Sequence, residues 1–120
     1  MHELAVCQAL IEQVERIARE QGARRVLSIT VSVGALSGTE ARLLEHAYPL
    51  AAAGTVGAQA ALVVEAVPVT VRCRKCRAET EAAPNRLLCG ACSDWHVDVV
   101  AGEELLLRRV EFEAAGDAVH

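Results

Sequence analysis

The sequence contains almost no aromatic residues. One Trp, one Tyr and one Phe stand among 120 residues, so aromatic side chains make up 2% of the chain. The hydrophobic core must therefore be built from Ala, Val, Leu and Ile. Surfaces that bind single-stranded nucleic acid stack the bases on aromatic rings, and this chain has few rings to offer such a surface.

An apolar run of transmembrane length and a signal peptide are also missing, which predicts a cytoplasmic protein that does not insert into a membrane. In that reducing compartment the five cysteines are expected to bind metal rather than to form disulfide bonds. The formal net charge of −4 argues against broad binding to nucleic acid. No nucleophile–base set and no Gly-rich phosphate loop is found, so we expect a protein that is not an enzyme.

Apolar residues are nonetheless plentiful. The composition is 52% hydrophobic and 23% charged, which is typical of a globular chain and not of a disordered one. A chain of 120 residues can hold one ordinary domain, or one small domain together with a module that a metal ion stabilises.

Two helices are predicted from the spacing of the apolar residues. Between Leu4 and Glu20 they recur every three or four positions, and Gly22 is expected to end the helix. The segment Ser37-Gly38-Thr39-Glu40 has the pattern of a capping box, in which Glu40 holds the start of a second helix. This second helix is expected to carry its apolar residues at Leu43, Leu44, Ala47 and Leu50, with Pro49 near its end.

Three strands are predicted as well. Arg25–Val33 alternates between an apolar set (Leu27, Ile29, Val31, Val33) and a polar set (Ser28, Thr30, Ser32), as a strand with one buried face does. A second strand is expected from Leu62 to Val71, with Pro68 near a sheet edge. The third runs from about Glu103 to Glu113, with Leu106, Val110 and Phe112 on one side, and should pair with the earlier strands. The expected fold class is therefore α+β, with two helices and a three-stranded sheet.

Four cysteines stand in two C-x-x-C pairs, Cys73 with Cys76 and Cys89 with Cys92, separated by twelve residues. Two-residue gaps let both sulfurs of a pair turn toward one ion, and this spacing is typical of a tetrahedral Zn(II) site. An iron–thiolate centre of the rubredoxin type would use the same residues, and a colourless protein with one zinc would exclude it.

The position of the cysteine pairs predicts two domains. About thirty residues around the pairs cannot bury enough surface to fold unaided, so a structural zinc would stabilise them. We expect a zinc-ribbon-like module over residues 71–100, inserted into a domain made of residues 1–70 and 101–120. Trp95 is expected to pack over the module, and His96 to lie outside the ligand set.

The N-terminus is the second candidate metal site. The amine of Met1, the backbone nitrogens of His2 and Glu3, and the His2 imidazole can surround one Ni(II) or Cu(II) ion in a plane. The first N–H groups of a helix have no acceptor within the helix, so their deprotonation costs no helical hydrogen bond. A start methionine followed by two exposed polar residues is the simpler interpretation of the same stretch.

Other candidate residues have structural explanations. Cys7 lies on the apolar side of the first predicted helix and is expected to be a small buried side chain. His46 is expected to be exposed or half-buried on the second helix. Glu40, besides its capping role, could stand close to the N-terminal site as a neighbouring carboxylate.

Several motifs recur together, in order, along nearly the whole chain: Met1-His2-Glu3-Leu4, Cys7-Gln8, the stretch from Val33 to Glu40, the two C-x-x-C pairs, and Gly102-Glu103-Glu104-Leu105. Together they resemble the HypA/HybF family of nickel-insertion chaperones for [NiFe]-hydrogenase maturation. The resemblance implies a small α/β nickel domain with a zinc module inserted before its last strand.

The same resemblance implies a nickel site centred on His2, with Glu3 and Glu40 close by, and a structural Zn(II) ion held by the four cysteines. It implies that Ni(II) is a transient cargo, delivered to the hydrogenase large subunit together with the GTPase HypB. Some relatives also serve urease, through urease accessory proteins.

The sequence departs from this family at the cysteine pairs. Some relatives carry histidine directly after a C-x-x-C pair, where this chain has Arg77 and Ser93. Gly90 stands where many relatives have proline, which is expected to loosen the second pair slightly.

The alternative function is a zinc-ribbon adaptor that binds nucleic acid or protein. Arg72, Arg74, Lys75 and Arg77 form a basic cluster in the sequence. The acidic overall balance makes an acidic protein a better partner for this cluster than nucleic acid.

Overall fold

The computed structural model describes residues 2–114, so the predictions for Met1 and for residues 115–120 lie outside the described part of the chain. Within these residues the fold contains two helices and six strands in two three-stranded sheets. The elements are α1 (His2–Gln21), β1 (Ala23–Gly34), α2 (Ala41–Ala52), β2 (Ala61–Val67), β3 (Val69–Cys73), β4 (Glu79–Ala82), β5 (Val97–Ala101) and β6 (Leu105–Ala114).

The chain divides into two compact units. The first consists of the residues up to Val31, Glu40–Glu65, and the residues from Leu107 onward, and the second consists of Ser32–Thr39 and Ala66–Leu106. The predicted division into residues 1–70 with 101–120 and residues 71–100 stays a prediction.

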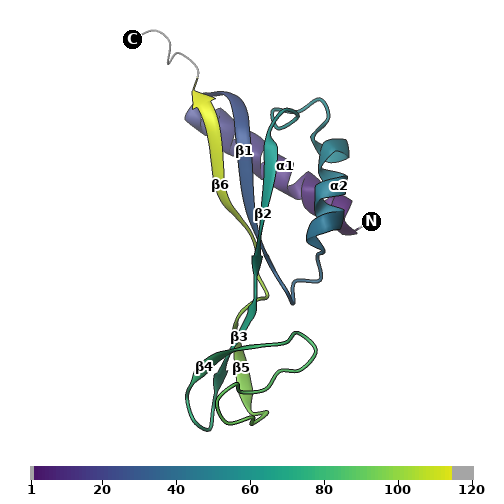
Figure 1. The fold of residues 1–120 in the computed structure, drawn as a ribbon. Helices are drawn as coiled ribbons and strands as arrows, with labels where there is room; N and C mark the ends of the chain where they lie inside the picture. The colour runs from purple at the N-terminus through teal and green to yellow at the C-terminus, as the bar shows by residue number, and fades with distance from the viewer. Residues whose placement is uncertain (1, 115–120) are drawn as a thin grey trace. The chain divides into compact units, whose positions relative to one another are not determined.

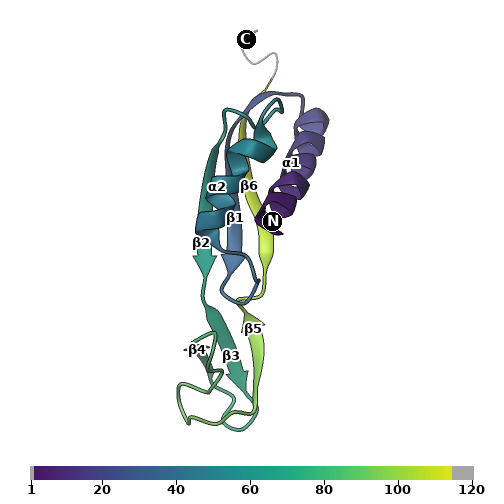
Figure 2. The same cartoon turned by 90° about the vertical axis from the view of Figure 1, so that its right-hand side faces the viewer.

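The first sheet has the order β2-β1-β6, so the predicted pairing of the last strand with an earlier one is confirmed. The arrows in Figure 1 show that β1 and β2 run in the same direction and β6 in the opposite one. Parallel neighbours need a crossover connection, and α2 lies within the crossover from β1 to β2. Figures 1 and 2 show α1 across one face of this sheet, with α2 beside α1.

The core of the first unit lies between the two helices and β1. Cys7 and Val14 of α1, Ile29 of β1 and Leu44 of α2 are all fully buried. The Cys7 thiol donates to the carbonyl oxygen of Leu44 over 3.5 Å, which confirms Cys7 as a small buried side chain that joins the helices. None of the helices among residues 2–114 is long and apolar enough to cross a membrane.

The start of α2 differs from the prediction. Glu40 itself is the N-cap residue and makes no side-chain capping bond, so the predicted capping box is wrong. The Ser37 hydroxyl instead accepts a hydrogen bond from the N–H of Thr39 at 3.2 Å, which closes a turn before the helix. The Glu40 side chain is therefore not used to hold the helix start.

Several apolar positions face the solvent. Helix α2 buries the line Leu44, Tyr48 and Ala52, while Leu43 is 45% and Leu50 is 75% exposed. Positions 43 and 50 lie on the side of the helix next to this buried line, and that side points away from the core. Tyr48, absent from the prediction, is buried and donates its hydroxyl to the carbonyl of Gly57 at 2.8 Å.

The predicted polar face of β1 is also wrong. Thr30 and Ser32 are buried, because β1 is the middle strand of its sheet and neighbouring strands cover both of its sides. Leu27, which was predicted on the buried face, is exposed, and its neighbour Val26 is buried. On the edge strand β6, Leu106 is exposed, while Val110 and Phe112 are half-buried.

Pro68 divides the second predicted strand into two. Because proline has no N–H, it cannot donate to a strand ladder, and the chain leaves β2 and enters β3 at this residue. Strand β3 is the middle strand of the second sheet, β4-β3-β5, and pairs antiparallel with both neighbours. The sequence did not predict this second sheet, which carries the cysteine pairs.

Candidate metal centres

The two C-x-x-C pairs lie on two turns of the second unit. Cys73 is the last residue of β3, and Cys76 follows on the turn that leads toward β4. Cys89 and Cys92 lie on the turn that precedes β5. Because β3 and β5 are hydrogen-bonded neighbours, the sheet brings the two pairs together.

The four sulfurs form a compact cluster. All four Sγ atoms lie within 4.8 Å of one another. The distance is 3.7 Å between Cys73 and Cys92 and 3.5 Å between Cys76 and Cys89, and all five cysteines are free of disulfide bonds. A regular tetrahedron with Zn–S bonds of about 2.3 Å has sulfurs about 3.8 Å apart. The donor set therefore fits one Zn(II) ion.

Backbone N–H groups point at the first sulfur of each pair. The N–H groups of Lys75 and Cys76 donate to Sγ of Cys73 at 3.3 and 3.4 Å. Those of Ala91 and Cys92 donate to Sγ of Cys89 over the same two distances. Hydrogen bonds from N–H groups stabilise a thiolate.

The thiols have strongly different proton affinities. The N–H groups of Cys92 and Ala91 lower the pKa of Cys89 to about 6. The N–H of Asp94 lowers the pKa of Cys92, but burial and hydrogen bonding with the other thiols outweigh it and raise the pKa to about 12. Without a cation, four thiolates cannot stand this close together, so a bound metal must displace protons from the cluster.

The residue after each pair has a left-handed backbone. Arg77 has φ 67° and Ser93 has φ 65°, a region that is unfavourable for residues other than glycine. The N–H of Arg77 bonds to the carbonyl of Cys73 at 3.0 Å, and that of Ser93 to the carbonyl of Cys89 at 2.9 Å. The two turns thus close in the same way, and the backbone conformation is set by the turn and not by the residue type.

Gly90 is held by a neighbouring strand. Its N–H donates to Oγ1 of Thr80 in β4 at 2.8 Å. A Cβ at this position would lie 3.0 Å from Cβ of Thr80. Proline could not make this hydrogen bond, so Gly90 suits the contact with Thr80. The sequence offered no signal for Thr80, because its place beside Gly90 depends on the fold of the second unit.

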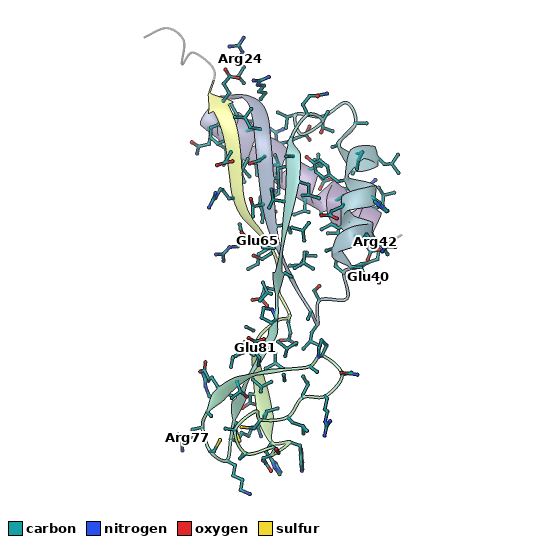
Figure 3. The ribbon with its side chains drawn as sticks, in the orientation of Figure 1. Arg24, Glu40, Arg42, Glu65, Arg77 and Glu81 are labelled. Carbon is teal, nitrogen blue, oxygen red and sulfur yellow. The ribbon has the colours of Figure 1, made fainter. Side chains whose placement is uncertain are left out.

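The basic cluster is partly neutralised. Arg72 forms an ion pair with Glu79 at 2.6 Å, and Arg74 with Asp98 at 2.6 Å. Figure 3 shows the labelled Arg77 at the turn that carries the first cysteine pair. Guanidinium groups that are already paired are poor phosphate ligands, so the arrangement gives the nucleic-acid alternative no support.

Trp95 does not pack over the cysteine cluster, so that expectation is wrong. Its side chain is 69% exposed and stacks on the His96 ring, with centroids 3.6 Å apart. His96 lies outside the sulfur cluster, and its Nδ1 is 2.9 Å from Oδ2 of Asp94.

The N-terminal candidate residues lie at the start of α1. His2 is the first residue of the helix and is exposed, and Glu3 is half-buried. Oε2 of Glu3 accepts a hydrogen bond from the main-chain N–H of Glu40 at 3.3 Å. This bond is the main cause of a lowered pKa of the Glu3 carboxyl. Figure 3 shows the labelled Glu40 where the chain enters α2, so His2, Glu3 and Glu40 are brought to one end of the first unit.

A shallow groove begins at this end of the helices. It has a volume of about 260 Å³ and is lined by Glu3 and Leu4 of α1 and by Leu43, His46, Ala47 and Leu50 of α2. His46 is exposed, as predicted. The groove explains where the exposed leucines lie, which the periodicity did not predict because it assigned them to the core.

Comparison with known proteins gives consistent results. A family described as hydrogenase/urease nickel incorporation, metallochaperone, hypA matches residues 1–112. Hydrogenase maturation factor HypA of Nitrosospira multiformis is 49% identical over 111 residues, covering 92% of this chain and 96% of the relative. The protein of the same name from Aquifex aeolicus is 34% identical over 113 residues, covering 94% and 98%.

Two solved structures share the fold. The solution structure of a HypA protein superposes with a TM-score of 0.71 at 25% identity, covering 95% of this chain and 98% of the other. The Ni metallochaperone HypA from Helicobacter pylori superposes with a TM-score of 0.68 at 24% identity, covering 93% and 97%. The expected combination of a helix-bearing sheet with a four-cysteine, zinc-ribbon-like module is thereby confirmed.

Proposed function

The chain belongs to the HypA family of nickel metallochaperones for hydrogenase maturation, and we propose that it carries Ni(II) at the N-terminal end of α1. It is a maturation factor and not an enzyme. The proposed ligands are the amine of Met1, the backbone nitrogens of His2 and Glu3, and the His2 imidazole. Nickel is the cargo of this site and must leave it again.

The hydrogen bond from Glu40 to the Glu3 carboxylate is the observation that supports this site. It holds the Glu3 carboxylate close to the proposed ligands and lowers its pKa, and a negative charge here offsets the repulsion between a cation and the positive end of the helix. An exposed site that exchanges nickel for protons can also release it, because the affinity falls as the pH falls.

The zinc site has a different task in this proposal. Cys73, Cys76, Cys89 and Cys92 hold one structural Zn(II) ion, and the ion stabilises the small β4-β3-β5 sheet. When bound, zinc supplies folding free energy and no catalysis. The chain's own contribution is the set of N–H groups aimed at Cys73 and Cys89, which favour the ionised sulfurs.

The proposed partners follow from the cargo. Nickel would pass to the hydrogenase large subunit with the help of the GTPase HypB, and urease is a second candidate recipient through its accessory proteins. We place the protein in the cytoplasm, because four thiolate ligands need a reducing compartment to stay free of disulfide bonds.

Nickel titration of the untagged protein tests the proposal. We expect one tight nickel site in the wild type, and at least about a tenfold loss of affinity in His2→Ala, since a planar nitrogen set loses a ligand. A second variant with extra residues before Met1 should lose the site as well, because the nitrogen of Met1 is then part of a peptide bond and is no longer a free amine. His46→Ala is the matched control, since it removes a histidine from the same groove.

Zinc content and the circular dichroism spectrum should be the same in all four proteins. Unchanged nickel affinity in either His2→Ala or the extended protein would overturn the N-terminal site. A loss of nickel affinity in His46→Ala equal to that in His2→Ala would instead move the site into the groove.

A further inference from the structure

Trp95 lies in the solvent at the end of the second cysteine turn. It is the only tryptophan of the chain and is 69% exposed. A tryptophan ring gains a large hydrophobic free energy when it is covered, and the second unit leaves most of this ring uncovered. Tryptophan is among the residues that contribute most to binding at protein interfaces, so Trp95 is a candidate contact for another molecule.

The ring of Trp95 is held in place. It stacks on the His96 ring, with centroids 3.6 Å apart. The His96 ring is fixed in turn, because its Nδ1 and its main-chain N–H lie 2.9 and 3.1 Å from Oδ2 of Asp94. The carbonyl of His96 also accepts a hydrogen bond from the N–H of Arg74 at 2.8 Å. A side chain that is already ordered loses little conformational entropy when a partner covers it.

A hollow lies beside this stack. Its volume is about 350 Å³, and it is lined by Arg74 and Lys75 from the first cysteine turn and by Asp94 and His96 from the second. His96 belongs both to the hollow and to the stack, so a segment that fills the hollow also comes close to Trp95. All of these residues belong to the second unit.

The charges around the hollow favour an acidic ligand. The guanidinium of Arg74 is paired with both carboxylate oxygens of Asp98, at 2.6–3.1 Å. The Asp94 carboxylate is held by His96 and is only 16% exposed. Lys75, the only lysine of the chain, acts on Asp94 through space and forms no salt bridge with any of residues 2–114. Its ammonium group is the positive charge that is left for a ligand.

We propose that Lys75, Trp95 and the hollow beside them bind an acidic segment of a partner protein. A carboxylate of that segment lies against Lys75, and an apolar side chain of the same segment covers the Trp95 ring. This inference does not rest on the nickel proposal, because the surface belongs to the second unit and uses none of the proposed nickel ligands.

Nucleic acid is a poorer ligand for this surface. A phosphate backbone is bound by several cations together, whereas Arg72 and Arg74 are already held in salt bridges. Proteins that bind single strands stack successive bases on several aromatic rings, and Trp95 is a single ring with one face already stacked. One carboxylate with a neighbouring apolar side chain needs only one cation and one ring.

Fluorescence of the zinc-loaded full chain tests the proposal, because all tryptophan emission comes from Trp95. The probes are a short peptide of glutamate, leucine and serine, the matched peptide with lysine in place of glutamate, and single-stranded oligothymidylate. The glutamate peptide should shift the emission to shorter wavelength as the ring leaves water. Anisotropy of dye-labelled probes measures affinity, and the glutamate peptide should bind at least about fivefold more tightly than either other probe.

Substitutions locate the site. Lys75→Glu should reverse the preference, so that the lysine peptide binds more tightly, because the charge beside the hollow changes sign. Trp95→Ala should weaken binding of the glutamate peptide at least about fivefold. Arg86→Glu is the matched control, since it makes the same change of charge in the same unit but outside the hollow, and it should bind like the wild type.

Zinc content should be equal in all of these proteins. If Lys75→Glu loses zinc, Lys75→Gln replaces it and should bind the two peptides equally. Equal binding of the two peptides by the wild type would overturn the proposal, and so would a preference that persists in the Lys75 variant. A loss in Arg86→Glu as large as that in the Lys75 variant would show that net charge and not this surface is the cause. Tighter binding of oligothymidylate than of the glutamate peptide would make the surface a nucleic-acid site instead.

Discussion

The main-chain N–H of Glu40 donates a hydrogen bond to Oε2 of Glu3 over 3.3 Å, across 37 positions of sequence. The bond ties the first turn of α1 to the residue that opens α2. The N–H of Glu40 is thereby bonded to Glu3 and not to a capping side chain of α2 itself. The same bond fixes the Glu3 carboxylate beside His2. Helix packing and the charge at the N-terminal end of α1 are thus coupled through one contact.

The Glu40 amide should report the protonation of Glu3. The bond with Glu40 lowers the pKa of Glu3, so the bond is complete above the ordinary pKa of a glutamate and is lost as the pH falls through the lowered value. An NMR titration should show the Glu40 amide shifting with a midpoint below that of ordinary glutamates. Glu3→Gln should abolish this titration, and a shift that persists in Glu3→Gln would contradict the assignment.

Loading zinc into the metal-free protein should release protons. Above pH 6 Cys89 is already ionised, whereas Cys92, with a pKa near 12, must lose its proton to bind. Below pH 6 Cys89 is protonated as well, so more protons are released and the affinity falls more steeply. Calorimetry in buffers of different protonation enthalpy measures the number of protons. A number that stays constant from pH 8 to pH 5 would contradict the lowered pKa of Cys89.

Gly90→Pro should destabilise the second cysteine pair. The change removes the bond to Thr80 and brings carbon atoms too close to its Cβ, for a cost of about 1–3 kcal/mol. Thermal unfolding of the zinc-loaded protein measures it. In a Thr80→Ala background the same change should cost clearly less, and equal costs in both backgrounds would show that Thr80 is not the cause.

Cys73→Ser should lose zinc and disorder the second unit. The β3 strand ends at this ligand, and its sheet has little core of its own, so NMR signals of β4 and β5 should collapse while those of α1 and α2 persist. Cys7→Ser is the matched control: it lowers the stability of the first unit, by about 1–3 kcal/mol for a buried polar group, and leaves zinc bound. Loss of all signals in Cys73→Ser would show that the two units fold as one.

The sequence predicted those features that depend only on residues close together in the chain, namely the cysteine turns and the buried side of α1. The C-x-x-C spacing is enough to bring the two sulfurs of each pair together, because each turn closes within five residues. The period of α1 likewise predicted its buried side, since one helix face meets one core.

The failures come from contacts between distant segments. Thr30 is buried because β1 has neighbours on both sides, which its own alternation cannot reveal. Leu43 and Leu50 belong to a groove and not to the core, although their residue type suits either. Pro68 was placed inside one continuous strand, because the sequence does not show that the chain leaves one sheet and enters another there.

The left-handed backbone at Arg77 and Ser93 has a consequence for the speed of metal exchange. Each residue holds a conformation that costs about 1–2 kcal/mol outside glycine, and that strain is relieved when the turn opens. The closed turns are thus raised in energy relative to the open ones, which shortens the lifetime of bound zinc. Glycine at both positions should therefore slow the escape of zinc to a strong chelator.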